Sequence, residues 1–227
     1  MFCYNNVLMF SPMGGKERTS VYLVGWANAW DWMPFWKDWG PTYQEGWCGF
    51  YNIPREAVLA EDNTLKFIPV KELQDLRKNK QEEADILIKE DEKKELRSGC
   101  VYETEMRINL KKSTADKIRL NLRMSQGKKT EILFDLKRAE AYFDRNNSDG
   151  WSKGVARCPL NLMGKEHLDI HIYSDKISLE IFSNEYQNNF SCNIYNVDDD
   201  QKNEMKAIGG DLMIESIRSW ELEKTMK

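Results

Sequence analysis

Hydrophobic and polar residues alternate one by one along much of the second half of the chain. One such run places on a common face the residues Tyr102, Thr104, Met106, Ile108 and Leu110. The same period of two recurs at residues 118–123 and 168–173. Because successive side chains of a strand point to opposite faces, this pattern predicts strands that bury one face.

Further strands are expected at residues 130–136, 177–182, 190–195 and 212–217, with turns between them. Many short alternating strands separated by turns are typical of an antiparallel β-sandwich. The pattern therefore predicts that residues 99–227 form a β-sandwich domain. Alternation alone does not give the order in which the strands pair.

Residues 70–98 follow a different pattern. After Pro69, apolar residues recur at spacings of three through residues 70–77, which predicts a short helix that begins after a proline. Residues 81–97 are mostly charged and are interrupted by the apolar run 86–88. We interpret residues 70–98 as a linker, with a short helix followed by a solvated connector that has room for one short strand.

Residues 1–69 are rich in aromatic residues and turns. Six of the eight tryptophans lie in residues 26–47, and strand-like runs occur at residues 7–10, 21–24 and 48–53. Glycine and proline pairs separate these runs, as expected for turns. The chain thus divides into three parts, at 1–69, 70–98 and 99–227.

Composition narrows the class of protein. Hydrophobic residues make up 41% and charged residues 31% of the chain, as in a globular domain, and the net charge of −4 is spread without a basic patch. A nucleic acid is therefore not an expected partner. A membrane is not expected either, because no apolar run approaches the length of a membrane span. No signal peptide is visible, and five dispersed cysteines are typical of a reduced cytoplasmic protein: Cys3, Cys48, Cys100, Cys158 and Cys192. No metal or other cofactor is expected.

A series of short motifs runs through the first part of the chain in a specific order. They are GWANAWDWMP at residues 25–34, EGWCG at 45–49, IPRE at 53–56 and PVKELQDLR at 69–77. The second half adds FDR at residues 143–145, DKISLEIFSN at 175–184, a glycine pair at 209–210 and WEL at 220–222. In this order the motifs resemble the C-terminal portion of glycoside hydrolase family 32, the group of β-fructofuranosidases, invertases and sucrose-6-phosphate hydrolases.

The resemblance implies an all-β fold: a remnant of a five-bladed β-propeller at residues 1–69, a short linking helix, and a C-terminal antiparallel β-sandwich. It implies a family activity of retaining hydrolysis, with a fructoside sugar as the substrate of the intact enzyme. Trp30 matches a tryptophan that walls the family's fructose pocket. The resemblance favours this pocket role in an intact enzyme, whereas in this truncated chain we favour packing of Trp30 between blades.

Retaining hydrolysis needs two carboxyl groups about 5–5.5 Å apart, one as nucleophile and one as acid/base. The family carries them in W-M-N-D-P-N-G and E-C-P motifs, with a further aspartate in R-D-P, and none of the three occurs in this chain. We therefore expect no catalytic residue and no hydrolysis by the chain alone. Residues 7–14 resemble the strand that follows E-C-P, which predicts an N-terminal truncation. Residues 22–25 run almost directly into GWANAWDWMP, where the family has a further stretch, and this predicts an internal deletion. A propeller remnant would expose sheet edges, and a homo-oligomer through them is an expected partner.

Other residues offer chemistry that must be weighed against ordinary structural roles. Four carboxylates near the tryptophans are either an acid/base set or, as we favour, turn and ion-pair residues: Asp31, Asp38, Glu45 and Glu56. His167 and His171 share one strand face, and we interpret them as surface residues rather than metal ligands. The run Asp198–Asp200 is interpreted as a solvated turn rather than a calcium site. Cys158 is interpreted as a buried structural thiol.

The alternative hypothesis for the sandwich is a binding function without catalysis. The sandwich could act as a non-catalytic carbohydrate-binding module if exposed aromatic side chains formed a platform for sugar rings. The available side chains are Trp151, Tyr186 and Tyr195.

Overall fold

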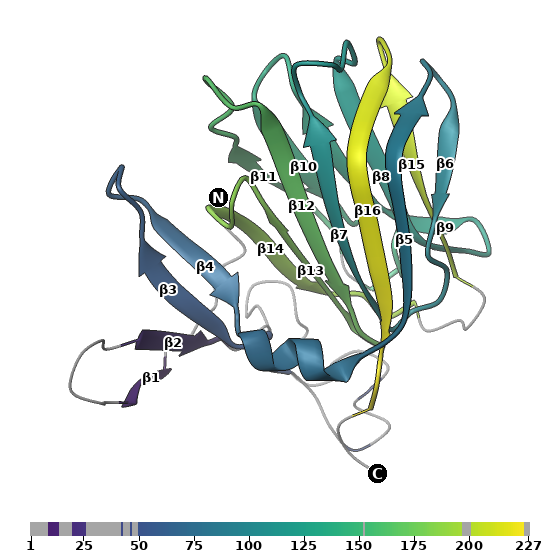
Figure 1. Cartoon of the computed structure of the whole chain (residues 1–227). Coiled ribbons are helices and arrows are strands. Elements are labelled where there is room, and N and C mark those ends of the chain that lie inside the picture. Colours follow the sequence, from purple (N-terminus) through teal and green to yellow (C-terminus); the bar gives the residue numbers. More distant parts are fainter. Residues whose placement is uncertain are drawn as a thin grey trace.

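The computed structural model describes residues 9–13, 20–25, 42, 46, 50–151, 153–196 and 201–224. Two six-stranded antiparallel sheets stack face to face, and a smaller four-stranded sheet lies to one side of them (Figure 1). The expected all-β class with an antiparallel sandwich is confirmed. Within the described ranges, no helix has the length and apolar character needed to cross a membrane.

The first sheet of the sandwich faces the small sheet, and we call it the inner sheet. Its strand order is β14-β13-β12-β7-β16-β5. The bounds are β14 Asn188–Asn193, β13 Ser178–Ser183, β12 His167–Ser174, β7 Tyr102–Asn109, β16 Leu212–Leu222 and β5 Arg77–Ile88. Neighbouring strands are antiparallel throughout.

The second sheet, here the outer sheet, has the order β11-β10-β9-β8-β15-β6. Its strands are β11 Val155–Pro159, β10 Glu140–Asp144, β9 Lys128–Asp135, β8 Lys117–Ser125, β15 Lys202–Ile208 and β6 Lys93–Leu96. The chain therefore crosses repeatedly between the sheets, as in other sandwiches.

The hydrophobic core fills the space between the two sheets. The inner sheet contributes residues such as Ile108 and Ile170, and the outer sheet contributes Leu120, Ile132 and Phe134, all of them inaccessible or nearly so. These are the apolar positions of the alternating runs. Burial of this surface is the main force that holds the sheets together.

The interpretation of residues 81–97 as a solvated connector is wrong. Residues 77–88 form strand β5, which pairs with β16, and residues 93–96 form β6, which pairs with β15. Both are edge strands, and an ion pair between Lys94 of β6 and Glu83 of β5 shows that they lie on the same side of the sandwich. Edge strands commonly carry charges that prevent pairing with another chain, so their sequence loses the alternation that marks inner strands. The short helix is present as the 3₁₀ helix η2, Lys71–Leu76.

The small sheet has the order β1-β2-β3-β4, with bounds Met9–Met13, Ser20–Val24, Arg55–Leu59 and Leu65–Pro69. Four antiparallel strands joined in sequence order are the unit of a β-propeller blade. Residues 50–53, the described part of the strand expected at residues 48–53, are not part of a strand of the small sheet, and β3 begins after Pro54. The backbone N–H groups of Asn52 and Ile53 bond to Gly25 and to the sandwich, and Pro54 has no N–H to donate to a ladder.

The glycine pair at residues 209–210 makes the turn between β15 and β16. Gly210 has a φ of +140°, and a Cβ there would lie 2.4 Å from the carbonyl oxygen of Thr114. Only glycine fits so close to a neighbouring backbone. The pair is therefore a structural requirement of the sandwich.

Candidate functional site

A hollow of about 550 Å³ lies between strand β4 of the small sheet and the exposed face of the inner sheet. Its walls carry mostly polar and charged side chains, among them Lys66, Arg107, Asp169, His171, Tyr186 and Arg218. Strand β4 is in contact with β14 of the inner sheet, and Figure 1 shows these two strands next to each other. The hollow is the place where propeller-like and sandwich residues meet, and we call it the inter-sheet cleft.

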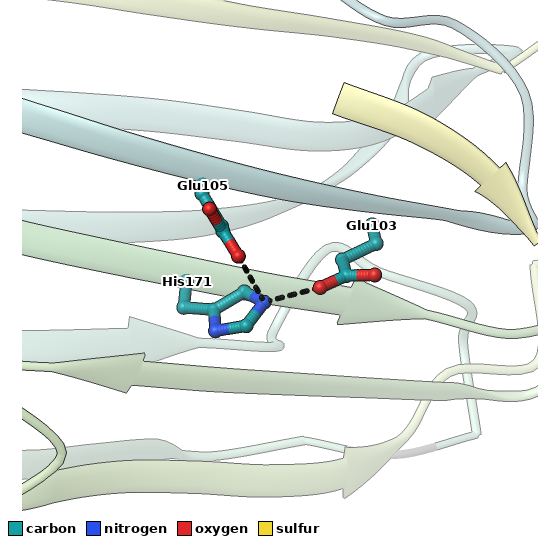
Figure 2. Close-up of side chains that lie close together, drawn as sticks. All are labelled: Glu103, Glu105 and His171. Carbon is teal, nitrogen blue, oxygen red and sulfur yellow. Dashed lines mark hydrogen bonds and ion pairs between the residues drawn. The ribbon is translucent and has the colours of Figure 1, made fainter. Parts of the chain in front are cut away.

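Glu105 and His171 line the cleft, and Glu103 lies beside them (Figure 2). Glu103 and Glu105 alternate with core residues along β7, so both point away from the sandwich core. His171 lies directly opposite Glu105 in the β12–β7 register. Its Nε2 atom is 2.7 Å from Oε1 of Glu103 and 3.8 Å from Oε1 of Glu105.

Arg77, at the start of β5, closes this cluster. Its guanidinium donates hydrogen bonds to both Glu103 and Glu105, with Nε 2.8 Å from Oε2 of Glu103. The Glu103 side chain is 0% exposed. Burial opposes its ionisation, but the hydrogen bonds from Arg77 and His171 outweigh burial and lower the pKa of Glu103 to about 2.

The three side chains Glu103, Glu105 and His171 are the one group in the described part of the chain whose ligand atoms lie close enough to hold a metal ion, within 4.8 Å of one another. The Arg77 guanidinium already bonds to both carboxylates, and Arg218 adds a second cation 2.8 Å from Glu105. Two cations therefore balance two carboxylates. A divalent cation would have to displace Arg77, so the arrangement favours a structural ion-pair cluster.

A second buried ion pair joins the small sheet to the sandwich. Arg55 of β3 bonds to Glu180 of β13, and the guanidinium carbon lies 4.8 Å from the centre of the Phe182 ring. Glu180 is 2% exposed and Arg55 is 6% exposed. Ser191 donates a further hydrogen bond of 2.9 Å to Glu180. Arg55 and Arg77 thus anchor strand β3 and the end of helix η2 on the same face of the inner sheet.

The interpretation of both histidines as surface residues is wrong for His171. Its side chain is 8% exposed because the exposed face of the inner sheet is covered by Arg77 and Tyr186. His167, four residues earlier, is 30% exposed and lies 2.9 Å from Glu215. The alternation placed both on one face, as observed, but it contained no sign of what covers that face.

The aromatic residues considered as a sugar platform do not form one surface. Tyr186 precedes β14 and lies beside His171, whereas Tyr195 follows the other end of β14. The backbone N–H groups of Trp151 and Tyr195 bond to the two carboxylate oxygens of Asp149. Trp151 is 47% exposed, but Tyr195 is buried. Tyr186 is the one of the three that lines the cleft.

The remaining residues singled out in the sequence are placed as follows. Cys158 is buried, as expected, and burial raises its pKa to about 11, which disfavours the reactive thiolate. Glu56 lies half-buried on β3. The others lie outside the residues that the structure describes: Trp30, Asp31, Asp38, Glu45 and Asp198–Asp200.

A family model described as "Glycosyl hydrolases family 32 C terminal" matches residues 72–221. The chain belongs to glycoside hydrolase family 32. The matched region begins in helix η2 and ends in β16, so it includes every strand of the sandwich. It also includes β5 and β6, whose mostly charged residues had been interpreted as a solvated connector.

This family 32 chain is 30% identical over 197 residues to a sucrose-6-phosphate hydrolase of Zymomonas mobilis subsp. mobilis, covering 85% of the chain and 38% of that relative. It is 24% identical to the raffinose invertase of Escherichia coli, covering 88% of the chain and 39% of the relative. An exo-inulinase from Aspergillus awamori has the same fold, with a TM-score of 0.75, 18% identity, and coverage of 91% of the chain and 41% of the inulinase. The chain thus spans about two fifths of the length of the curated relatives it matches.

The two arginine anchors were not found by sequence reasoning. Both arginines lie in motifs that the sequence analysis identified: Arg55 in IPRE and Arg77 at the end of PVKELQDLR. Their partners are Glu180, which lies in DKISLEIFSN, and Glu103. An arginine and a glutamate at polar positions of separate motifs could have been proposed as pairs, but their sequence separations of 125 and 26 residues gave no reason to choose these partners.

Proposed function

We propose that this chain is the C-terminal part of a β-fructofuranosidase, acting in hydrolysis of sucrose, sucrose 6-phosphate or fructans only together with the catalytic part of a propeller. Family membership and the hydrolase and invertase relatives support this proposal. By itself the chain does not hydrolyse fructosides, since it has none of the family's three acidic motifs.

The proposal of inactivity is supported by the ionisation and the arginine contacts of Glu103 and Glu105, the two carboxylates that converge on His171. A general acid of a glycosidase needs a carboxyl group that stays protonated near its working pH. Glu103 has the opposite property, because Arg77 and His171 lower its pKa to about 2. Both Glu103 and Glu105 are also engaged by Arg77, which leaves neither free to attack a sugar.

Fructose release by the purified chain tests this proposal. Sucrose, sucrose 6-phosphate and a short fructan are incubated with the chain, and free fructose is measured against a blank without protein. The full-length Zymomonas sucrose-6-phosphate hydrolase serves as the positive control. We expect release equal to the blank, and turnover by the chain alone would overturn the proposal.

A second candidate function is carbohydrate binding in the inter-sheet cleft. One observation favours it: the Tyr186 ring shares the cleft with Arg107 and Asp169, whose side chains are paired at 2.8 Å. Aromatic rings stack on sugar faces, and charged planar groups bond to sugar hydroxyls.

Calorimetric titration with short fructans tests this second function. We expect Tyr186→Ala to abolish the heat of binding. We expect Trp151→Ala to retain it, because Trp151 is an exposed aromatic residue outside the cleft. Equal heats for both variants would exclude the cleft as the site.

A further inference from the structure

Glu180 lies in the sandwich but supports a segment of the small sheet. One carboxylate oxygen, Oε1, accepts a hydrogen bond of 2.7 Å from the backbone N–H of Ile53. The other, Oε2, accepts from the Arg55 guanidinium and from Ser191. Glu180 therefore holds residues 53 and 55 on either side of Pro54, and its own burial at 2% exposure keeps water from competing for these bonds.

The supported segment in turn holds the end of strand β2. Asn52, next to Ile53, accepts a 2.6 Å hydrogen bond from the N–H of Gly25 through its side-chain oxygen. The N–H of Asn52 donates a 2.8 Å bond back to the carbonyl of Gly25. Both residues are buried. Gly25 thus has its N–H and its C=O bonded to one residue, and that residue is adjacent to the contact with Glu180.

Gly25 is the first residue of the GWANAWDWMP motif, which contains Trp30. We infer that Glu180 is a positioning residue for this motif: it fixes Ile53 and Arg55, and through Asn52 it fixes the backbone position at which the motif begins. Its bearing on function rests on the proposed β-fructofuranosidase role, because Trp30 of this motif matches a tryptophan of the family's fructose pocket. Through these contacts the sandwich fixes Gly25, the residue at which the motif begins.

The chemistry of the segment explains why a carboxylate is required. The backbone N–H of Ile53 and the side-chain guanidinium of Arg55 are the two donors that point to Glu180, on either side of Pro54. A carboxylate accepts from both with separate oxygens, whereas a glutamine amide has one acceptor oxygen and would turn its NH₂ group toward one of the donors. Glu180→Gln therefore keeps the size of the side chain but loses one of the two hydrogen bonds, either that from Ile53 or that from Arg55.

A matched control distinguishes positioning from general stability. Glu103 lies in the same sheet, is equally buried, and is also paired to an arginine, but it contacts Arg77 and His171 rather than residues 52–55. Glu103→Gln is thus the same chemical change on the same sheet face without a connection to Gly25. A purely structural role of buried carboxylates predicts the same result for both variants.

Amide hydrogen exchange in the ¹⁵N-glycine-labelled chain is the test. We expect Glu180→Gln to speed exchange of the Gly25 amide by about tenfold or more, since a charged buried hydrogen bond is lost, while Glu103→Gln changes it by less than about twofold. Asn52→Ala should speed it as well, and the double variant should show less than the product of the two effects. An unchanged Gly25 amide in Glu180→Gln, or equal acceleration by Glu103→Gln, overturns the inference.

Two further measurements complete the test. If Glu180→Gln does not fold, Ser191→Ala removes one hydrogen bond to Oε2 and should speed Gly25 exchange severalfold, and no change would overturn the inference. Near-ultraviolet circular dichroism reports on the tryptophans, six of which lie in residues 26–47. We expect it to change in Glu180→Gln and Asn52→Ala but not in Glu103→Gln. If Gly25 responds as expected but no variant alters fructan binding, the positioning role stands while the link between this motif and a sugar fails.

Discussion

Arg77 donates hydrogen bonds to Glu103, and its guanidinium carbon lies 3.9 Å from the centre of the Trp220 ring. The arginine is the first residue of β5 and directly follows helix η2, whereas the glutamate and the tryptophan belong to β7 and β16. One side chain therefore attaches the linking helix to two central strands of the inner sheet. This attachment adds to the pairing with β16 in holding β5, an edge strand with few buried residues.

Removing Arg77 should destabilise the chain strongly. Arg77→Ala leaves the buried carboxylate of Glu103 without its main partner, and breaking a buried pair from one side typically costs about 3–5 kcal/mol. Urea denaturation followed by circular dichroism measures the free energy of unfolding. Lys78→Ala is the control, because its exposed pair with Glu223 should contribute less than about 0.5 kcal/mol. Similar losses for the two variants would contradict the importance of this anchor.

The stability of the chain should depend on pH through Glu103. Its pKa is lowered from 4.5 to about 2 in the folded state, so the ionised carboxylate stabilises the fold above the unfolded pKa, and this stabilisation is lost as the pH falls toward 2. The contribution is roughly 3 kcal/mol. The free energy of unfolding of the wild type should therefore fall more steeply on acidification than that of Glu103→Gln. Parallel pH profiles would show that Glu103 is not held ionised.

Divalent metal ions should not stabilise the wild-type chain. Arg77 bonds to both carboxylates of the cluster, so zinc or manganese would have to displace it. A ligand that binds only the folded state raises the melting temperature as its concentration increases, and here we expect a shift below about 1 °C. Differential scanning fluorimetry with zinc, manganese and a chelator makes the measurement. A rise in melting temperature that grows with zinc concentration, and that His171→Ala abolishes, would instead establish a metal site.

The turn between β15 and β16 should not tolerate a side chain at residue 210. Gly210→Ala places a methyl group against the Thr114 backbone at a positive φ, and we expect a loss of more than about 2 kcal/mol. Gly164→Ala is the control, because residue 164 also has a positive φ but has nothing within 4 Å of its Cβ position, so about 1 kcal/mol is expected. Chemical denaturation compares the two. Equal losses would mean that the backbone conformation, not the close approach, limits this turn.

The purified chain should self-associate. Within the described part of the small sheet, β1 is an edge strand that pairs with β2 on one side, and such edges pair readily with a second chain. Light scattering over a range of protein concentrations should show a molar mass that rises above the 26.7 kDa of one chain. Met9→Pro or Phe10→Pro, which remove a donor from this edge, should lower the mass. A constant mass of one chain at every concentration would exclude this association.

The alternation of side chains was a sound guide to the faces of the inner strands. It assigned Met106, Ile108 and Ile170 to the core, and it assigned His171 and Glu105 to the opposite face, as observed. Alternation did not predict β5 and β6, because these edge strands carry mostly charged, exposed residues and have no continuous buried face. It also suggested a strand before Pro54, where the backbone donors are directed to other residues.

The sequence by itself determined the family, the sandwich class and the face to which each alternating residue points, since a period of two follows from strand geometry alone. Only the tertiary structure decided which polar residues meet. Glu180 pairs with Arg55 and His171 with Glu103 because of strand order, register and the approach of the small sheet to the sandwich. These relations depend on the contacts of the whole fold, and a local pattern does not contain them.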